Sequence, residues 1–219
     1  MMANRRSGTT RARLSDLVAP ARALADRLAA QRDAGRSPCR KGCSACCYYL
    51  VSVSPPEARV IASRVMAMPP RLRRAIEDRI EKAALTLLRR PAPRGADASQ
   101  LSAWYRSLDL ACPFLKDDAC AIYDDRPLVC REHSVVGTPK KCADAADAST
   151  PQEAAVSMAE VLARLCGQVT GRDAVAIMLP LAVYMQLKGA ASREKTFTQQ
   201  WLMQQFTDAV AAAMRDRAA

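Results

Sequence analysis

Apolar residues recur at helical spacing along most of the chain, and stretches rich in glycine, proline and small polar residues separate these segments. Between Leu14 and Gln31 the apolar positions return every three or four residues, which is typical of an amphipathic helix. The same spacing predicts a second helix over 71–90. The phrase Ser54-Pro-Pro-Glu57 predicts the start of another helix, because serine can cap, proline suits the first turn and glutamate can complete a capping box.

The last third of the chain carries similar signals. Thr150-Pro-Gln-Glu153 has the same chemistry as the first helix start and predicts a helix to about Cys166. A helix over 172–188 is also expected, with a kink or a break at Pro180. A final amphipathic helix is predicted over 195–215. The fold class predicted from these patterns is mainly α, with little or no sheet.

The expected organisation is a single helical domain over 13–219, preceded by a basic, disordered segment at 1–12. A chain of 219 residues is long enough to bury a real core without the help of a staple. Within this domain, residues 37–142 form a cysteine-rich region, and 150–219 form a C-terminal helical part.

The charge is strongly basic, with a formal net charge of +11, but it is not concentrated in a pattern that reads nucleic acid. The arginines are mixed with acidic residues along the predicted helices, and only 5% of residues are aromatic. We therefore expect a solvated basic surface and no nucleic-acid partner. An acidic protein partner remains compatible with the charge.

Neither membrane insertion nor export is predicted. The N-terminus is basic without an uninterrupted apolar stretch, and the most apolar later stretch, 174–187, is too short and interrupted to span a bilayer. We therefore expect a cytoplasmic protein, in a reducing compartment where structural disulfides are rare. The cysteine count of nine is odd, which also favours metal binding over a disulfide framework.

The cysteines form two groups, and thiolate sulfur without matching histidines or carboxylates favours zinc or an iron–sulfur cluster. Read together, the groups predict a composite site in which cysteine-bearing loops between helices converge on a metal ion. Eight thiols exceed the needs of one four-coordinate ion, so the sequence indicates either two sites or a spare reactive thiol. The candidate metal ligands are Cys39, Cys43, Cys46 and Cys47 in the first group, and Cys112, Cys120, Cys130 and Cys142 in the second.

Neighbours of these cysteines suggest how the loops are built. Gly42 and the pair Asp117-Asp118 predict tight turns, and loop amides could hydrogen-bond sulfur. The positive charge of Arg131 is expected to favour a thiolate nearby. His133 is the only histidine, and a single histidine is more often a satisfied core or surface residue than a ligand. Cys166 lies in an apolar helical pattern and is expected to be a small buried hydrophobe.

The spacing C-x3-C-x2-C-C, the phrase Ser54-Pro-Pro-Glu-Ala58 and the phrase CPFLKDDACAIYDDRPLVCR together resemble the YkgJ-type cysteine-cluster proteins. These bacterial proteins are also described as the CxxCxxCC zinc- or iron-chelating family. The resemblance covers about residues 37–142 and implies metal chelation by the motif cysteines, with a weaker transfer to Cys142. Flagellin lysine N-methylases, whose chemistry is linked to an iron–sulfur cluster, have a similar cysteine region.

Several functions stay open on the sequence. The leading interpretation is a cytoplasmic protein that binds iron, as an iron–sulfur cluster, or zinc. A second is an iron–sulfur-dependent protein-modifying enzyme resembling flagellin lysine N-methylase, although nothing outside the cysteine region identifies a methyl-donor pocket. A third is a structural-zinc protein, or a redox or metal-delivery module. The sequence identifies no catalytic residue and no Gly-rich dinucleotide fingerprint.

Overall fold

The computed structural model describes residues 10–33, 37–135, 156–172, 174–190 and 193–216. Helices dominate this part of the chain and the strands are short, so the predicted mainly α class is confirmed. The helices are α1 (Val18–Asp33), α2 (Pro55–Met66), α3 (Pro70–Arg89), α4 (Ala98–Ser107), α5 (Leu128–Glu132), α7 (Met158–Thr170), α8 (Leu179–Leu187) and α9 (Gln199–Asp216).

The strands pair into small antiparallel sheets that join distant parts of the chain. They are β1 (Arg11–Arg13), β2 (Ser52–Val53), β3 (Leu115–Lys116), β4 (Ala119–Cys120), β5 (Ile177–Met178) and β6 (Thr196–Thr198). The pairs are β1 with β6, β2 with β5, and β3 with β4. The predicted boundary at residue 13 falls inside β1, where Arg11 is already paired with Thr198.

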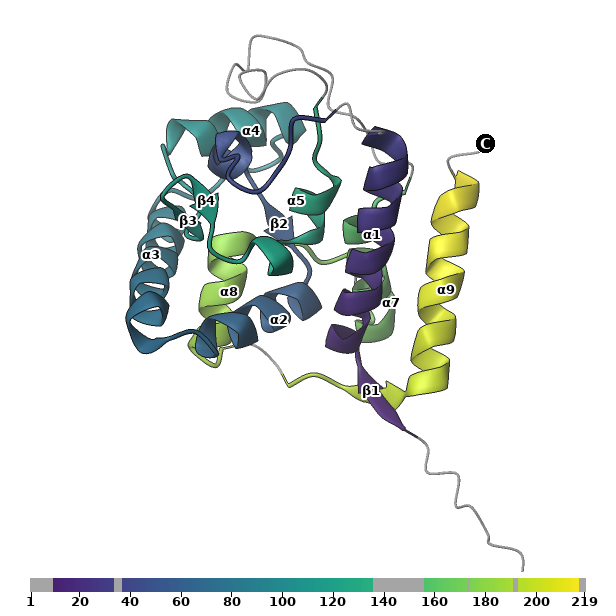
Figure 1. The fold of residues 1–219 in the computed structure, drawn as a ribbon. Coiled ribbons are helices and arrows are strands. Elements are labelled where there is room, and N and C mark those ends of the chain that lie inside the picture. The colour runs from purple at the N-terminus through teal and green to yellow at the C-terminus, as the bar shows by residue number, and fades with distance from the viewer. Residues whose placement is uncertain (1–9, 34–36, 136–155, 173, 191–192, 217–219) are drawn as a thin grey trace, which may run out of the picture.

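The helices bury two large apolar clusters and a smaller third one around Tyr105. The helices that enclose the two large clusters lie side by side in Figure 1. In one cluster, α1, α7 and α9 pack around residues such as Leu17 and Leu162. In the other, α2, α3 and α8 pack around fully buried side chains such as Ile61, Ile80 and Val183. Burying one such side chain is worth about 1.5–3 kcal/mol, so the amphipathic pattern of each helix accounts for its position.

The predicted helix start before α2 is confirmed in detail. Ser54 is the N-cap, proline occupies the first turn, and Glu57 completes the capping box by accepting hydrogen bonds from the backbone N–H and the hydroxyl of Ser54. The helices predicted over 14–31 and 71–90 are present as α1, after a short 3-10 turn, and as α3. Helix α4, capped by Asp97, was not anticipated from the sequence.

The predictions for the last third need correction. The expected start at Thr150 lies outside the described residues. Residues 156–157 are not helical, and α7 begins at Met158 with Ser157 as its N-cap and continues beyond the predicted end at Cys166 to Thr170. Helix α7 is capped at its C-terminal end by Gly171, whose φ of +69° is the left-handed conformation that suits glycine. Strand β5 separates α7 from α8, so the helix predicted over 172–188 is broken before Pro180. Pro180 lies in the first turn of α8, where a missing backbone N–H is tolerated.

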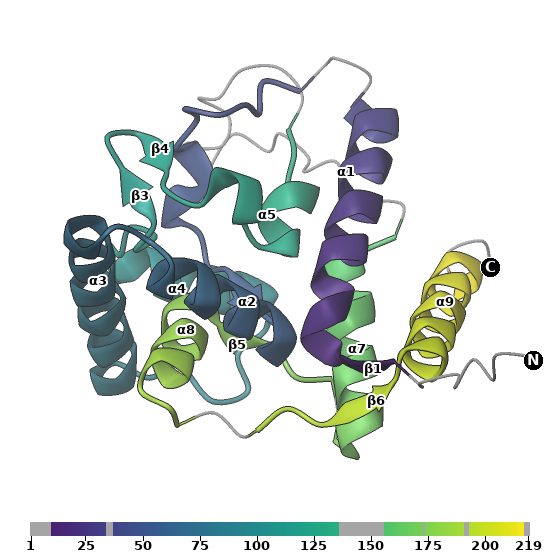
Figure 2. The same cartoon turned by 60° about the horizontal axis from the view of Figure 1, so that its bottom comes forward.

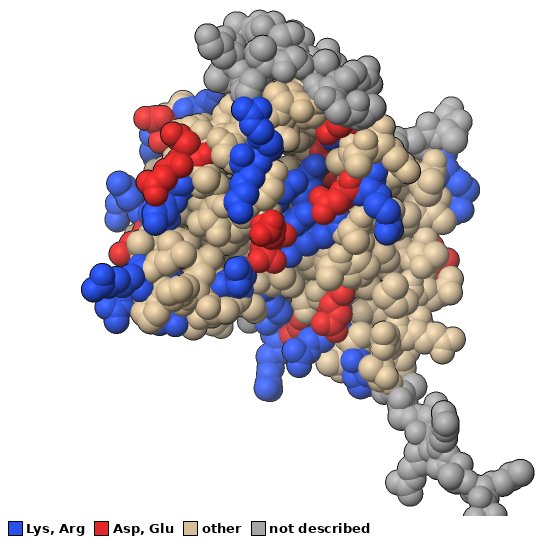
Figure 3. Space-filling view, viewed as in Figure 1, with Lys and Arg blue, Asp and Glu red and all other residues tan. Residues whose placement is uncertain are grey.

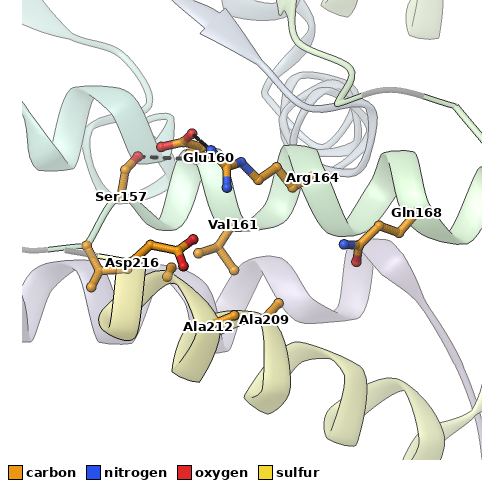
Figure 4. Close-up of a pocket in the computed structure, with 10 residues that line it drawn as sticks. Ser157, Glu160, Val161, Arg164, Gln168, Ala209, Ala212 and Asp216 are labelled. Atoms are coloured by element: carbon orange, nitrogen blue, oxygen red, sulfur yellow. Dashed lines mark hydrogen bonds and ion pairs between the residues drawn. The ribbon is translucent and has the colours of Figure 1, made fainter. Parts of the chain in front are cut away.

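The C-terminal helix α9 packs along α7 at the edge of the molecule (Figure 1). It begins only after β6, later than the predicted residue 195. Figure 4 shows Ala209 and Ala212 of α9 facing Val161 of α7 across a small cavity of about 220 Å³. Two of the charged residues that line it are already engaged, since Arg164 forms an ion pair with Glu160 at 2.5 Å.

Acidic and basic side chains are interspersed on the surface. On the face shown in Figure 3, basic and acidic side chains lie next to one another over much of the area. Arg22 and Arg64, for example, both form ion pairs with Asp125, each at 3.0 Å. Within the described residues, no helix combines the length and the apolar character needed to cross a bilayer.

Candidate metal centre

Five of the candidate cysteines lie on short, tightly turned segments. Cys46 and Cys47 lie in a 3-10 turn at Ala45–Tyr48. Cys112 opens the turn that leads into β3, and Cys120 ends β4. Cys130 is on the short helix α5. The first cysteine group is therefore separated from the second by α2, α3 and α4, as the composite interpretation requires.

Two hydrogen bonds tie the two cysteine groups together. The Cys112 backbone N–H donates to the Cys47 carbonyl oxygen at 2.7 Å. The Ser44 hydroxyl lies 3.2 Å from a carboxyl oxygen of Asp118, at the tip of the β3–β4 hairpin. Asp117 and Asp118 have φ of +49° and +56°, the left-handed pair that a two-residue hairpin turn needs, which confirms the predicted turn.

Five thiols are close enough to influence one another's ionisation. The charges of Cys112, Cys46 and Cys120 each raise the pKa of Cys130, after the larger effect of its burial. The pKa of Cys47 is likewise raised by Cys112 and Cys120, after the effects of its hydrogen bond to Cys46 and of burial. We call Cys46, Cys47, Cys112, Cys120 and Cys130 the five-thiol cluster.

The neighbouring residues Cys46 and Cys47 have thiol pKa values that are shifted in opposite directions. The thiol of Cys47 donates a hydrogen bond to the sulfur of Cys46, and this bond lowers the pKa of Cys46 to about 7. The same bond, together with burial, raises the pKa of Cys47. The 3-10 turn brings these two neighbouring side chains together. Both thiols could serve one site only if the backbone turned tightly here.

Backbone amides support the sulfurs of the second group. Burial raises the pKa of Cys112 to about 12, although the N–H groups of Phe114 and Leu115 donate to its sulfur and oppose the rise. Burial also raises the pKa of Cys120, against a similar bond from the N–H of Ile122. Amides that donate to a ligand sulfur orient it and tune the metal that it holds. The amide–sulfur contacts expected from the sequence are thus present.

The cation that faces the thiols is not the one expected. Arg131 donates to Asp26 at 2.6 Å and to the backbone carbonyl oxygens of Asp124 and Arg126, so its charge is used inside the fold. Arg126 instead lowers the pKa of Cys46, Cys120 and Cys130. Its guanidinium lies over the Tyr123 ring at 4.2 Å. The sequence signal for this role was its place between Asp125 and Pro127 in the cysteine motif.

Two buried carboxyl groups hold the segment that carries Cys130. Glu57, only 1% exposed, accepts from the Leu128 N–H at 2.9 Å, at the first residue of α5. Glu132, at the other end of α5, accepts from the N–H groups of Met158 and Ala159 at the start of α7. The motif glutamate before α2 therefore does more than cap its own helix, because it fixes the start of the helix that bears a thiol.

His133, directly after α5, has an unusual environment. Its ring meets that of Tyr49 edge to face at 5.8 Å. Burial, and then the charge of Arg32, lowers its pKa, so the ring is neutral at pH 7. Its Nε2 atom is buried, and no hydrogen-bond partner for it is found among the described residues. A neutral imidazole with a free nitrogen has the chemistry of a metal ligand.

The remaining cysteines lie outside the five-thiol cluster. Cys39 is exposed and Cys43 partly buried, on the loop that leads into the cluster, where Gly42 has φ of +91°. Cys142 lies outside the described residues. Cys166 is 4% exposed inside an apolar cluster, which confirms it as a small buried hydrophobe. Across the described residues, no three His, Cys, Asp or Glu side chains form a ready-made metal-binding group.

The donor chemistry nevertheless fits a soft metal. The cluster offers sulfur donors from three separate segments, amide hydrogen bonds to two of the sulfurs and a facing arginine. Such a set suits zinc or iron–sulfur chemistry and does not suit the oxygen-loving calcium or magnesium ions. The fold and the site thus define a helical, cysteine-rich metal-binding domain.

Comparison with known families agrees with this class. The family model CxxCxxCC, described as "Putative zinc- or iron-chelating domain", matches residues 38–155. This match covers more than half of the 219-residue chain, and the chain belongs to this family. It also includes Cys142, which the resemblance on motif residues reached only weakly. No curated protein and no solved structure gave a significant match to the chain.

Proposed function

We propose that this domain holds an iron–sulfur cluster, or else zinc, through thiolates from both cysteine groups. The observation that carries the proposal is the five-thiol cluster, in which sulfurs from three segments alter one another's pKa. The ligands would be drawn from Cys39, Cys43, Cys46, Cys47, Cys112, Cys120, Cys130 and Cys142.

Binding would remove the electrostatic conflict within the cluster. Several of these thiols have raised pKa values because burial and neighbouring sulfurs both oppose a second negative charge. A metal cation relieves that repulsion, and the ligand thiols lose their protons as it binds. Arg126 would offset part of the negative charge that remains on the loaded thiolates.

The form of the metal decides what the site can do. An iron–sulfur cluster supplies one-electron transfer, whereas zinc supplies no redox chemistry and holds the loops together. The described donors are sulfurs, which suit either form, and both one zinc ion and one iron–sulfur cluster take four of them, so the number of thiols favours neither. A protein-modifying enzyme like flagellin lysine N-methylase stays an alternative, as does a structural-zinc protein.

A redox or metal-delivery role has one specific observation in its favour. Cys46 and Cys47 are adjacent, hydrogen-bonded through their side chains, and differ in the direction of their pKa shifts. A thiol with a lowered pKa is the better nucleophile in exchange reactions near neutral pH. A cytoplasmic location and an acidic protein partner remain predictions from the sequence, and we do not expect nucleic acid to bind.

Anaerobic purification with metal and sulfide analysis tests the proposed form. Iron with an equal amount of labile sulfide, and a broad visible absorption, would support the cluster. Colourless protein with one zinc per chain would contradict it and favour the structural alternative. If chelation of that zinc also unfolds the protein, the metal contributes to folding directly.

A further inference from the structure

A cavity of about 540 Å³ lies between the two large apolar clusters and shares no residue with the five-thiol cluster. Its walls come from the start of α2, the end of α7, one side of α8 and the segment 193–197 that includes part of β6. Figure 2 shows α8 on the side of α2 and α3, and β6 on the side of α7 and α9. A cavity of this size is typical of a site for a small molecule.

The walls of this cavity are apolar. They are formed by aliphatic, thioether and aromatic side chains, including Val169, Val175, Ile177, Met185 and Phe197. Met185 is one of the large apolar residues that stay exposed, at 39%. An apolar surface held open in this way gains free energy when a ligand with an apolar body covers it.

The charged residues around the cavity are mostly cations. Arg172, Arg193 and Lys195 line it and are exposed to solvent, and Arg59 lines it as well. Positive side chains at the mouth of an apolar cavity attract an anion and weakly repel a cation.

Glu194 is the one acidic residue among the described lining residues, and its oxygens are engaged. One oxygen accepts from the Ser15 N–H at 2.6 Å, and the other accepts from the Ser15 hydroxyl at 2.8 Å. The second oxygen also lies 3.2 Å from Arg59 Nε. Its negative charge is therefore balanced within the fold, and the outer cations leave the mouth net positive.

We propose that this cavity binds an amphiphilic anion, an apolar chain that ends in a carboxylate or phosphate group. The chain would lie along the wall made by Val175, Ile177 and Met185, and the anionic head would lie near Arg193 and Lys195. A neutral amphiphile would gain the apolar contacts and lose the charge contacts, and a short anion would do the reverse. Both parts of the ligand are needed for tight binding.

The test is calorimetric titration of the full-length, metal-loaded protein with decanoate, decyl phosphate, decanol and acetate. We expect saturable binding of one or both ten-carbon anions, with at least about tenfold weaker binding of decanol and acetate. The tighter of the two anions assigns the head group. Equal binding of decanol, or no binding of either anion, overturns the proposal.

Substitutions separate charge from shape. The double variant Arg193→Glu, Lys195→Glu should bind the anion about tenfold more weakly, and this loss should shrink at high salt. The matched control is Arg71→Glu, Arg74→Glu, which changes the net charge equally on the exposed side of α3 and should keep wild-type affinity. Equal losses in the two double variants would contradict the assignment.

A cavity-filling change provides a second arm. Val175 precedes β5 outside any helix, so Val175→Trp should fill the cavity while the protein keeps its metal content and its thermal transition. Binding should then be lost. Because metal content is measured separately, failure of this proposal is distinct from failure of the metal site.

Discussion

Replacing Glu57 with alanine tests whether the glutamate before α2 positions the thiol-bearing helix. Its carboxyl group accepts hydrogen bonds from the Ser54 N–H and hydroxyl at 3.1 and 2.9 Å, and from the Leu128 N–H at 2.9 Å. All three donors and the carboxyl group are buried. Alanine would leave both backbone N–H groups without a partner, and water would have little access to replace it.

The magnitude follows from those two N–H groups. A buried donor left without a partner costs about 1–3 kcal/mol, so Glu57→Ala should lower the free energy of unfolding by roughly 2–6 kcal/mol. For a chain of this size, each kcal/mol shifts the midpoint of thermal unfolding by about 2–4 °C. The loss is a large part of the roughly 5–15 kcal/mol by which a typical domain is stable, so the denaturant midpoint of unfolding should be clearly lower for Glu57→Ala than for the unsubstituted protein.

The metal site should weaken as well, because Leu128 opens the helix that carries Cys130. Chelator competition should show about tenfold weaker metal binding, within the range known for residues that support a ligand. Gln100→Ala is the matched control, since Gln100 occupies the same capping position in α4, where its exposed side chain accepts a hydrogen bond from the N–H of its own cap residue, Asp97. Glu57→Ala that behaves like Gln100→Ala in both assays would refute the positioning role.

Three further predictions concern the cluster itself. Arg126→Gln should raise the pKa of Cys46 and weaken metal binding a few-fold at pH 7, with less effect at higher pH; an unchanged affinity in chelator competition would contradict this. In metal-free protein, iodoacetamide should alkylate Cys46 with a midpoint near pH 7, and Cys47→Ala should move that midpoint upward, whereas Cys47→Ser keeps a donor and should not. Arg131→Met should destabilise the fold through lost contacts with Asp26, without the pH dependence that Arg126→Gln shows in metal binding.

Helix caps and helical periodicity predicted an element correctly where only one such signal occurred in the segment. The capping box before α2 and the periodic residues of α1 and α3 lie within one segment each, so the sequence contains all the information they need. The start of α7 at Ser157 was not predicted because Thr150-Pro-Gln-Glu153 and Ser157 to Glu160 both have the form of a capped helix start. The start at Ser157 is completed by a distant residue, Glu132, and such a partner is invisible to a local pattern.

The sequence predicted that cysteines of the two groups lie near one another, because sulfur chemistry and spacing are both written in the chain, and a metal shared by both groups stays a prediction. The charged residues that act on the thiols could not be predicted, since they depend on which side chains the fold turns toward the sulfurs. Arg131 is next to Cys130 in sequence but bonds to Asp26, whereas Arg126 acts on the thiols. In the same way, nothing local to Glu57 indicates that it reaches Leu128, seventy-one residues away along the chain.

The central claim is that both cysteine groups supply ligands to one metal centre. The most direct measurement is the metal content of Cys46→Ser, Cys112→Ser and the matched control Cys166→Ser, purified anaerobically and compared with the wild type. We predict that the first two variants each lose most of the metal, one from each group, and that Cys166→Ser keeps it because its thiol is buried in an apolar cluster. Full metal content in a folded Cys112→Ser variant, or equal loss in all three, would contradict the account.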